Sequence, residues 1–152
     1  MANAEISTVP PPGIRFPAPE SKLCPLPIDA AKIPAGFPSP AADYENGRLD
    51  INTYLIRNPV ATFFFTVEGR SMEGAEIFDG DIVVVDRSIT PRHGHIVVAF
   101  IHGERLLKRL YRRAHRVALI SENPDFPPVE IREDAEFAVW GVVVGKFKRL
   151  PA

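Results

Sequence analysis

The sequence predicts a mainly β protein, in which a compact β-rich domain with one short helix follows an extended N-terminal arm. Short runs of β-branched and aromatic residues alternate with close turns after residue 60, a pattern typical of all-β domains. Only one segment carries clear helix-start and helix-stop signals. Ten of the sixteen prolines lie in the first forty residues, and proline excludes a long helix or a central strand there.

The proline distribution also predicts how the chain is divided. We expect residues 1–40 to form a flexible regulatory arm, partly of polyproline II character. Residues 41–152 then form the β-rich domain, because a chain of 152 residues suits a single domain.

The one helix is predicted at residues 51–57. Asp50 can cap its first turn, and Leu49 and Tyr54 stand at the two positions of a hydrophobic staple. Pro59 ends the element, since proline cannot continue a helix.

The strands are predicted from apolar, β-branched runs that end at turn residues. "DIVVVD" is a continuous apolar run between polar ends, which suits a strand buried on both faces. His102-Gly103 predicts the turn of a hairpin, and Gly141 and Gly145 predict a bulge or a sharp bend. The predicted strand regions are residues 61–69, 81–86, 95–111 (the hairpin), 116–121 and 137–148, with a loop at 121–131.

Composition excludes several classes of function. The net charge of −1 argues against strong direct binding of nucleic acid. Cys24 is the only cysteine, so neither an internal disulfide nor a cysteine-based metal site can form. The N-terminus lacks a basic, apolar signal peptide, and no segment is long and apolar enough to span a membrane. We therefore expect a cytoplasmic, soluble protein.

Ser71 lies in a glycine-rich bend just before the apolar strand at 81–86. A serine in such a bend is commonly a turn residue, and it becomes a nucleophile only when a base takes its proton. The four histidines have no evident carboxylate partner in the sequence; they are His93, His95, His102 and His115. A lysine is the other known partner of a catalytic serine.

Lys108 is the best candidate for that lysine. The strand period of two puts Leu106, Lys108 and Leu110 on one face, where burial would favour the neutral amine. Arg105 and Arg109 add positive charge beside it, which would act in the same direction. The alternative is an edge-strand lysine that discourages aggregation.

Ser71 and Lys108 stand within a longer combination of motifs: Gly69-x-Ser71-Met72, Asp79-Gly80-Asp81, Gly94-x-Ile96-Val97 and Lys108. This combination is more specific than either residue alone. It resembles the LexA/UmuD-type self-cleaving serine peptidases, over residues 36 to about 148. The stretch "FPSPAADYENGRLDINTYL", residues 37–55, looks like the start of the processed form in the UmuD branch of this family.

The resemblance implies a LexA/UmuD-type peptidase fold and a site for each role. Ser71 would be the nucleophile and Lys108 the general base. The backbone N–H groups of Arg70 and Ser71 would stabilise the tetrahedral intermediate. The substrate would be the chain's own arm, cut between Ala35 and Gly36, the one Ala-Gly pair of the sequence; such a pair is otherwise common in turns.

The resemblance also implies a biological setting. A RecA filament on single-stranded DNA would stimulate self-cleavage during the SOS response to DNA damage. The shortened product would act as a homodimer with a UmuC-like DNA polymerase subunit in error-prone translesion synthesis. The arm has too few helix-compatible residues for the helix-turn-helix of a repressor. The alternative interpretation is a non-catalytic scaffold for a polymerase.

Two further patterns have simpler interpretations. His93-Gly94-His95 lacks supporting carboxylates, so turn residues are favoured over a metal site, and we expect no metal and no cofactor. The basic run from Lys108 to Arg116 could contact DNA or an acidic partner, but a solvated face is the simpler interpretation.

Overall fold

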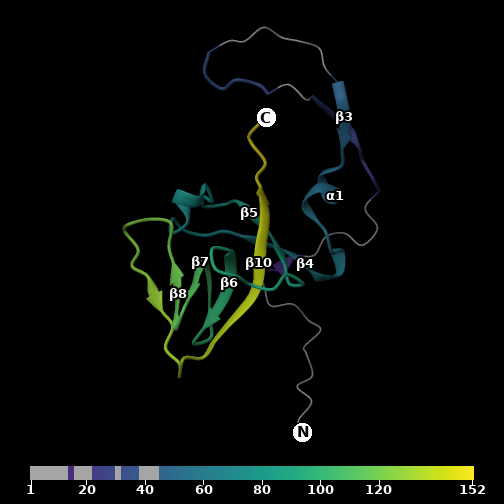
Figure 1. Cartoon of the computed structure of the whole chain (residues 1–152). Coiled ribbons are helices and arrows are strands. Elements are labelled where there is room, and N and C mark those ends of the chain that lie inside the picture. Colours follow the sequence, from purple (N-terminus) through teal and green to yellow (C-terminus); the bar gives the residue numbers. More distant parts are fainter. Residues whose placement is uncertain (1–13, 16–21, 30–31, 38–44) are drawn as a thin grey trace.

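The computed structural model describes residues 14–15, 22–29, 32–37 and 45–152. These residues form an eight-stranded and a two-stranded antiparallel sheet (Figure 1). The mainly β fold class is confirmed. The elements are β1 (Ile14–Arg15), β2 (Leu26–Asp29), β3 (Glu45–Leu49), α1 (Ile51–Leu55), the 3-10 helix η1 (Pro59–Ala61), β4 (Thr62–Thr66), the 3-10 helix η2 (Glu73–Ala75), β5 (Ile82–Asp86), β6 (Ile96–Ile101), β7 (Glu104–Arg113), β8 (Arg116–Ile120), β9 (Val129–Glu130) and β10 (Phe137–Phe147).

The large sheet has the strand order β1-β4-β5-β10-β6-β7-β8-β9. Strand β5 lies inside it, and Val83, Val84 and Val85 are at most 1% exposed. The prediction of a strand buried on both faces is therefore confirmed. Val83 and Val85 contribute to a core that also buries Met72 and Val98.

The long strand β10 joins the two halves of the sheet. It pairs with β6 through its first part and with β5 through its second part. The register shifts at Gly141 and again at Gly145, so the predicted bulges are confirmed. A Cβ on Gly141 would lie 2.6 Å from Val85 Cγ1, and one on Gly145 would lie 2.8 Å from Leu55 Cδ2. Val85 is fully buried, so the approach at Gly141 favours glycine, whereas the end of the Leu55 side chain would have to shift for a larger residue at position 145.

The hairpin of β6 and β7 forms as predicted. Its turn residues His102 and Gly103 both have positive φ angles, 49° and 80°, as the type I′ turn of a two-residue hairpin requires. The turn fixes the register in which Val97 of β6 lies opposite Lys108 of β7.

Helix α1 begins where it was expected but is shorter than predicted. Asp50 accepts a hydrogen bond from the Thr53 N–H at 2.8 Å, which confirms the N-cap. The helix ends at Leu55 rather than at residue 57, because Ile56 already has extended backbone angles. Among the helices of the described residues, none has the length and apolar character needed to cross a membrane.

The N-terminal arm contains two short strands that the proline pattern did not predict. Strand β1 pairs with β4 at the end of the large sheet, and β2 pairs with β3. Both are edge strands, where proline is tolerated. The β2–β3 pairing crosses the predicted boundary at residue 40, and that boundary stays a prediction. The predicted loop at residues 121–131 includes the two-residue strand β9.

Candidate active site

Ser71 lies in a turn between β4 and η2, and local contacts define the shape of this turn. Gly69 has a φ angle of 95°, which strongly favours glycine. Its N–H donates a hydrogen bond of 2.8 Å to Asp79 Oδ1. Met72 is 2% exposed and packs with Ile77 and neighbouring core residues. The buried methionine therefore anchors the turn in the core.

The segment after β8 holds the serine turn from the other side. The Glu122 N–H donates to the Ser71 carbonyl at 2.8 Å, and the Gly74 N–H donates to the Glu122 carbonyl at 2.6 Å. Asn123 Nδ2 donates to the Arg70 carbonyl at 2.9 Å. A Cβ on Gly74 would lie 2.5 Å from the Glu122 carbonyl oxygen, so this approach requires glycine. Three hydrogen bonds thus connect the serine turn to residues 122–123.

Strand β7 brings Lys108 to the serine. Lys108 Nζ lies 2.7 Å from Ser71 Oγ, within hydrogen-bonding distance. Lys108 is 9% exposed and Leu110 beside it on the same face is fully buried, as the strand period predicted. Burial lowers the pKa of Lys108 below its ordinary value of 10.5, because a low-polarity environment disfavours the ammonium ion.

The neighbouring arginines have roles other than the expected one. Arg109 forms an ion pair with Glu122 and donates a hydrogen bond of 2.7 Å to the Gly94 carbonyl. Arg105 Cζ lies 5.9 Å from the centre of the Phe65 ring. Burial is the cause of the lowered lysine pKa, so the expectation that both arginines contribute to it is corrected.

The predicted oxyanion donors are the backbone N–H groups of Arg70 and Ser71. Within the part of the chain that the structure describes, neither donates to a protein acceptor. The Arg70 side chain is turned to Glu73, which it meets in an ion pair of 2.9 Å. The carbonyls of Arg70 and Ser71 are both hydrogen-bonded, which restricts the orientation of the backbone at the serine.

A second pair of contacts supports the segment that follows the turn. Asp81 accepts a hydrogen bond from the Phe78 N–H at 2.9 Å, and its carboxylate lies 2.9 Å from Lys146 Nζ. Burial opposes ionisation of this carboxyl, but these two interactions outweigh it and hold the pKa of Asp81 below its ordinary value. Asp81 thereby fixes the Asp79-Gly80 turn that holds Gly69.

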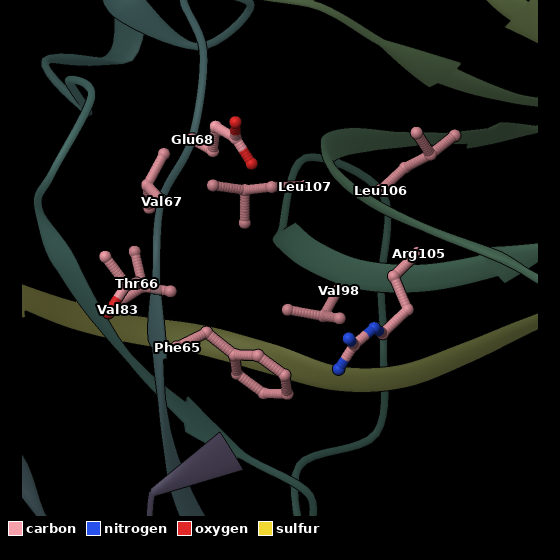
Figure 2. Close-up of a pocket in the computed structure, with 9 residues that line it drawn as sticks. All are labelled: Phe65, Thr66, Val67, Glu68, Val83, Val98, Arg105, Leu106 and Leu107. Carbon is pink, nitrogen blue, oxygen red and sulfur yellow. The ribbon is translucent and has the colours of Figure 1, made fainter. Parts of the chain in front are cut away.

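A groove of about 310 Å³ is lined by two segments that come shortly before Ser71 and Lys108 in the sequence. One wall is Phe65–Glu68, at the end of β4, and the other is Arg105–Leu107 of β7, with Val83 and Val98 also in the lining. Figure 2 shows the Arg105 side chain directed toward Phe65 and Val98 across this space. Strand β8 pairs with β7 only from Arg109 onward, so the groove-lining part of β7 lies outside that pairing.

The structure does not bring the predicted cleavage site to the serine. Ala35 and Gly36 lie exposed in a bend, and a Cβ on Gly36 would meet no atom within 4 Å. The flanking Ile33 and Phe37 are 93% and 91% exposed. In Figure 1 residues 32–37 lie in the loop beyond β3, away from β7.

The two histidines of the His93-Gly94-His95 segment accept hydrogen bonds, His95 from its own turn and His93 from strand β7. His95 Nδ1 accepts from the Arg92 N–H at 3.2 Å, and His93 Nδ1 accepts from the Arg112 N–H at 3.1 Å. In the described ranges, no group of three or more His, Cys, Asp or Glu side chains could hold a metal ion.

Sequence reasoning did not assign roles to Asp79, Glu122 and Asn123. Asp79 belongs to a recognised motif, but its contact with the Gly69 N–H was not foreseen. Glu122 and Asn123 fell in the predicted loop, where Asn-Pro is an ordinary turn signal. Their contacts are with a segment about fifty positions earlier, and local sequence carries no sign of that.

The chain is similar in sequence to several known proteins. Residues 27–144 match the Peptidase S24-like family. Protein MucA of Salmonella typhimurium is 48% identical over 124 residues, which cover 81% of this chain and 84% of that protein. Protein ImpA of Escherichia coli is 49% identical over 126 residues, covering 82% and 86%. The LexA repressor of Acidithiobacillus ferrooxidans is 39% identical over 137 residues, covering 88% and 65%.

Proposed function

The chain belongs to the Peptidase S24-like family and within it to the LexA/UmuD type, and on this premise we propose that it is a self-cleaving serine peptidase. The observation that carries the proposal is the 2.7 Å contact between Lys108 Nζ and Ser71 Oγ. Burial of the lysine favours the neutral amine, which is the form that can accept the serine proton.

The first half of the reaction forms an acyl-enzyme. Neutral Lys108 accepts the proton from Ser71 Oγ, and the oxygen attacks the carbonyl carbon of Ala35. The N–H groups of Arg70 and Ser71 stabilise the negative charge of the tetrahedral intermediate. The bond to the Gly36 nitrogen then breaks, and the Lys108 ammonium gives its proton to that nitrogen, which leaves as the new amino terminus.

The second half releases the arm. Lys108, neutral again, takes a proton from water, and the resulting hydroxide attacks the ester carbonyl of Ala35. The Ser71 oxygen leaves and recovers the proton from Lys108. The products are an arm that ends in the Ala35 carboxylate and a domain that begins at Gly36.

The chain between the cleavage segment and the domain is long enough to cross a domain of this size. Leu49 at the end of β3 is thirteen positions after Gly36, and an extended chain of that length spans about 45 Å. A domain of about 100 residues has a radius of gyration of roughly 13 Å, so the segment can cross its face. The same reach allows cleavage within one chain or between the two chains of a dimer.

The groove beside the serine suits an extended peptide. The part of β7 that precedes Arg109 lies outside the pairing with β8, and a substrate can add to such a strand edge as a further strand. Phe65, Val83 and Val98 supply apolar lining for the exposed Ile33 and Phe37 that flank the Ala-Gly pair. Small residues at the cut let the substrate backbone approach the serine closely.

We assign the peptidase to SOS mutagenesis. The similarity to MucA and ImpA supports this UmuD-like role. In this proposal a RecA filament on single-stranded DNA stimulates cleavage in the cytoplasm. The shortened homodimer then serves as the accessory subunit of a UmuC-like polymerase in translesion synthesis.

Mass spectrometry of the incubated protein tests nucleophile, cleavage site and activity together. At alkaline pH, where more Lys108 is neutral, the full chain should release a fragment that begins at Gly36. Ser71→Ala and Lys108→Ala should each abolish the fragment while circular dichroism shows an unchanged fold. A fragment that persists in both variants rejects the catalytic pair. A wild-type chain that stays intact favours the alternative, a non-catalytic scaffold for a polymerase.

A further inference from the structure

We infer that Asn123 is a positioning residue, which orients the Ser71 N–H toward the oxyanion that forms during cleavage. The inference rests on the proposed function and assigns a role to a side chain outside the Ser71–Lys108 pair. Its basis is the hydrogen bond of 2.9 Å from Asn123 Nδ2 to the carbonyl oxygen of Arg70, which is shorter than the 3.4 Å bond that the Glu73 N–H donates to the same oxygen.

The Arg70 carbonyl and the Ser71 N–H belong to one peptide unit. This unit is planar, and the chain has no cis peptide bond among the described residues. In a trans peptide the C=O and N–H bonds point in opposite directions. A donor that fixes the direction of the Arg70 carbonyl therefore also fixes the Ser71 N–H, which faces away from Asn123.

A second hydrogen bond sets the orientation of the Asn123 amide itself. The Asp125 N–H donates to Asn123 Oδ1 at 3.0 Å, in the pattern of an Asx turn. Because Oδ1 is the acceptor in this turn, the Nδ2 group is the one that faces the Arg70 carbonyl. The orientation of the amide is therefore set by the acceptor contact of Oδ1 and by the donor contact of Nδ2.

The next peptide unit is held by the same loop. The Glu122 N–H donates to the Ser71 carbonyl at 2.8 Å, and the Glu122 carboxylate is paired with Arg109 of β7. Asn123 and Glu122 thus brace the backbone on both sides of Ser71. The anchor is β7, the strand that also carries Lys108, so the base and the N–H donor are positioned from one element.

Asn123→Ser in the full-length protein isolates the contact. A serine oxygen can still accept the Asp125 N–H, as serine does in such turns, but the side chain is too short to donate to the Arg70 carbonyl. We expect self-cleavage to slow by about 10- to 100-fold, somewhat less than the 10²–10³ lost with a whole oxyanion donor. Asn123→Asp, which also keeps the turn and lacks the donor, should be slow as well.

Two readouts separate positioning from a general loss of structure. The urea midpoint of unfolding should stay within error of the wild type. The pH at which the cleavage rate is half-maximal should not move in Asn123→Ser, because the substitution is neutral and leaves the Lys108 contact in place. Asn52→Ser, on the exposed face of α1, is the matched control and should cleave at the wild-type rate.

Each other result overturns the inference. Wild-type cleavage rates in Asn123→Ser would show that the amide has no role, while the proposed function would stand. If the cleavage rate of Asn123→Ser falls together with its urea midpoint of unfolding, Asn123 has only a structural role. A wild-type protein that never yields the Gly36 fragment would remove the proposed function, and this inference with it.

Discussion

Lys108 Nζ lies 2.7 Å from Ser71 Oγ although thirty-seven positions separate the two residues in the chain. The contact combines a hydroxyl in a braced turn with an amine whose pKa is lowered by burial. Neither group is reactive alone at neutral pH, since a serine needs a base and an ordinary lysine is protonated. Their proximity is the physical basis for the following predictions.

Lys108→Arg should abolish self-cleavage even though it conserves the positive charge. The guanidinium stays protonated at any pH that the fold tolerates, so it cannot accept the serine proton. We expect the cleavage rate to fall by about 10²–10⁴-fold, the usual contribution of a general base. The half-life of the intact chain, measured on gels at alkaline pH, provides the test. Lys22→Arg in the exposed part of the arm is the control, and equal rates in both variants would contradict a base role.

The cleavage rate should rise with pH and level off once Lys108 is neutral. Because burial lowers the pKa of Lys108, the midpoint of the rise should lie below 10.5. The sign is fixed by the chemistry: the neutral amine is active, and it predominates above the folded-state pKa. Initial rates measured across the neutral to alkaline range would test this. A rate that decreases over this range would be incompatible with lysine as the base.

Gly74→Ala should disturb the connection between the serine turn and residue 122. The added methyl group would lie 2.5 Å from the Glu122 carbonyl oxygen, so the backbone must shift. We expect a loss of about 1–3 kcal/mol in the free energy of unfolding, together with slower cleavage. Urea denaturation and fragment release can be followed on the same sample. Gly47→Ala, whose Cβ would make an ordinary 3.6 Å contact with Ile28, should leave both quantities close to wild type.

Asp81→Asn should lower stability in a pH-dependent way. The buried carboxylate loses its ion pair with Lys146, and we expect a cost of about 1–3 kcal/mol at neutral pH. Interactions in the folded state depress the Asp81 pKa, so its stabilisation is present above the unfolded value of about 3.9. It is lost as the pH falls through the folded value. The difference in urea midpoint between wild type and variant should therefore shrink once the pH falls below the pKa of this carboxyl in the unfolded chain. A difference independent of pH would exclude the ion pair as its cause.

Local chemistry is enough to predict several elements of this fold. The Asp50 cap, the turn at His102-Gly103 and the bulges at Gly141 and Gly145 are each set by short-range sterics or hydrogen bonds. Such features depend on φ angles and on missing side-chain atoms, which the residue type specifies. The predicted end of α1 was two residues too late, because Ile56 already has extended backbone angles.

The short edge strands were not foreseeable. Strands β1 and β2 consist of two and four residues, and their own sequences carry no strand pattern. They exist because an edge with free backbone groups, on β4 or on β3, stands beside them. The same dependence on a partner explains why β9 appeared within a segment predicted as a loop.

The sequence by itself determined the mainly β class, the residues able to act as nucleophile and base, and the glycines that permit the close approaches. Periodicity and residue type express these properties locally. Only the tertiary structure decided that Lys108 meets Ser71, that Glu122 and Asn123 hold the serine turn, and that Ala35–Gly36 lies apart from both. Those relations arise from strand pairing between segments that are distant in the sequence. The stability of such pairing depends on the whole sheet, so no short stretch of chain can predict it.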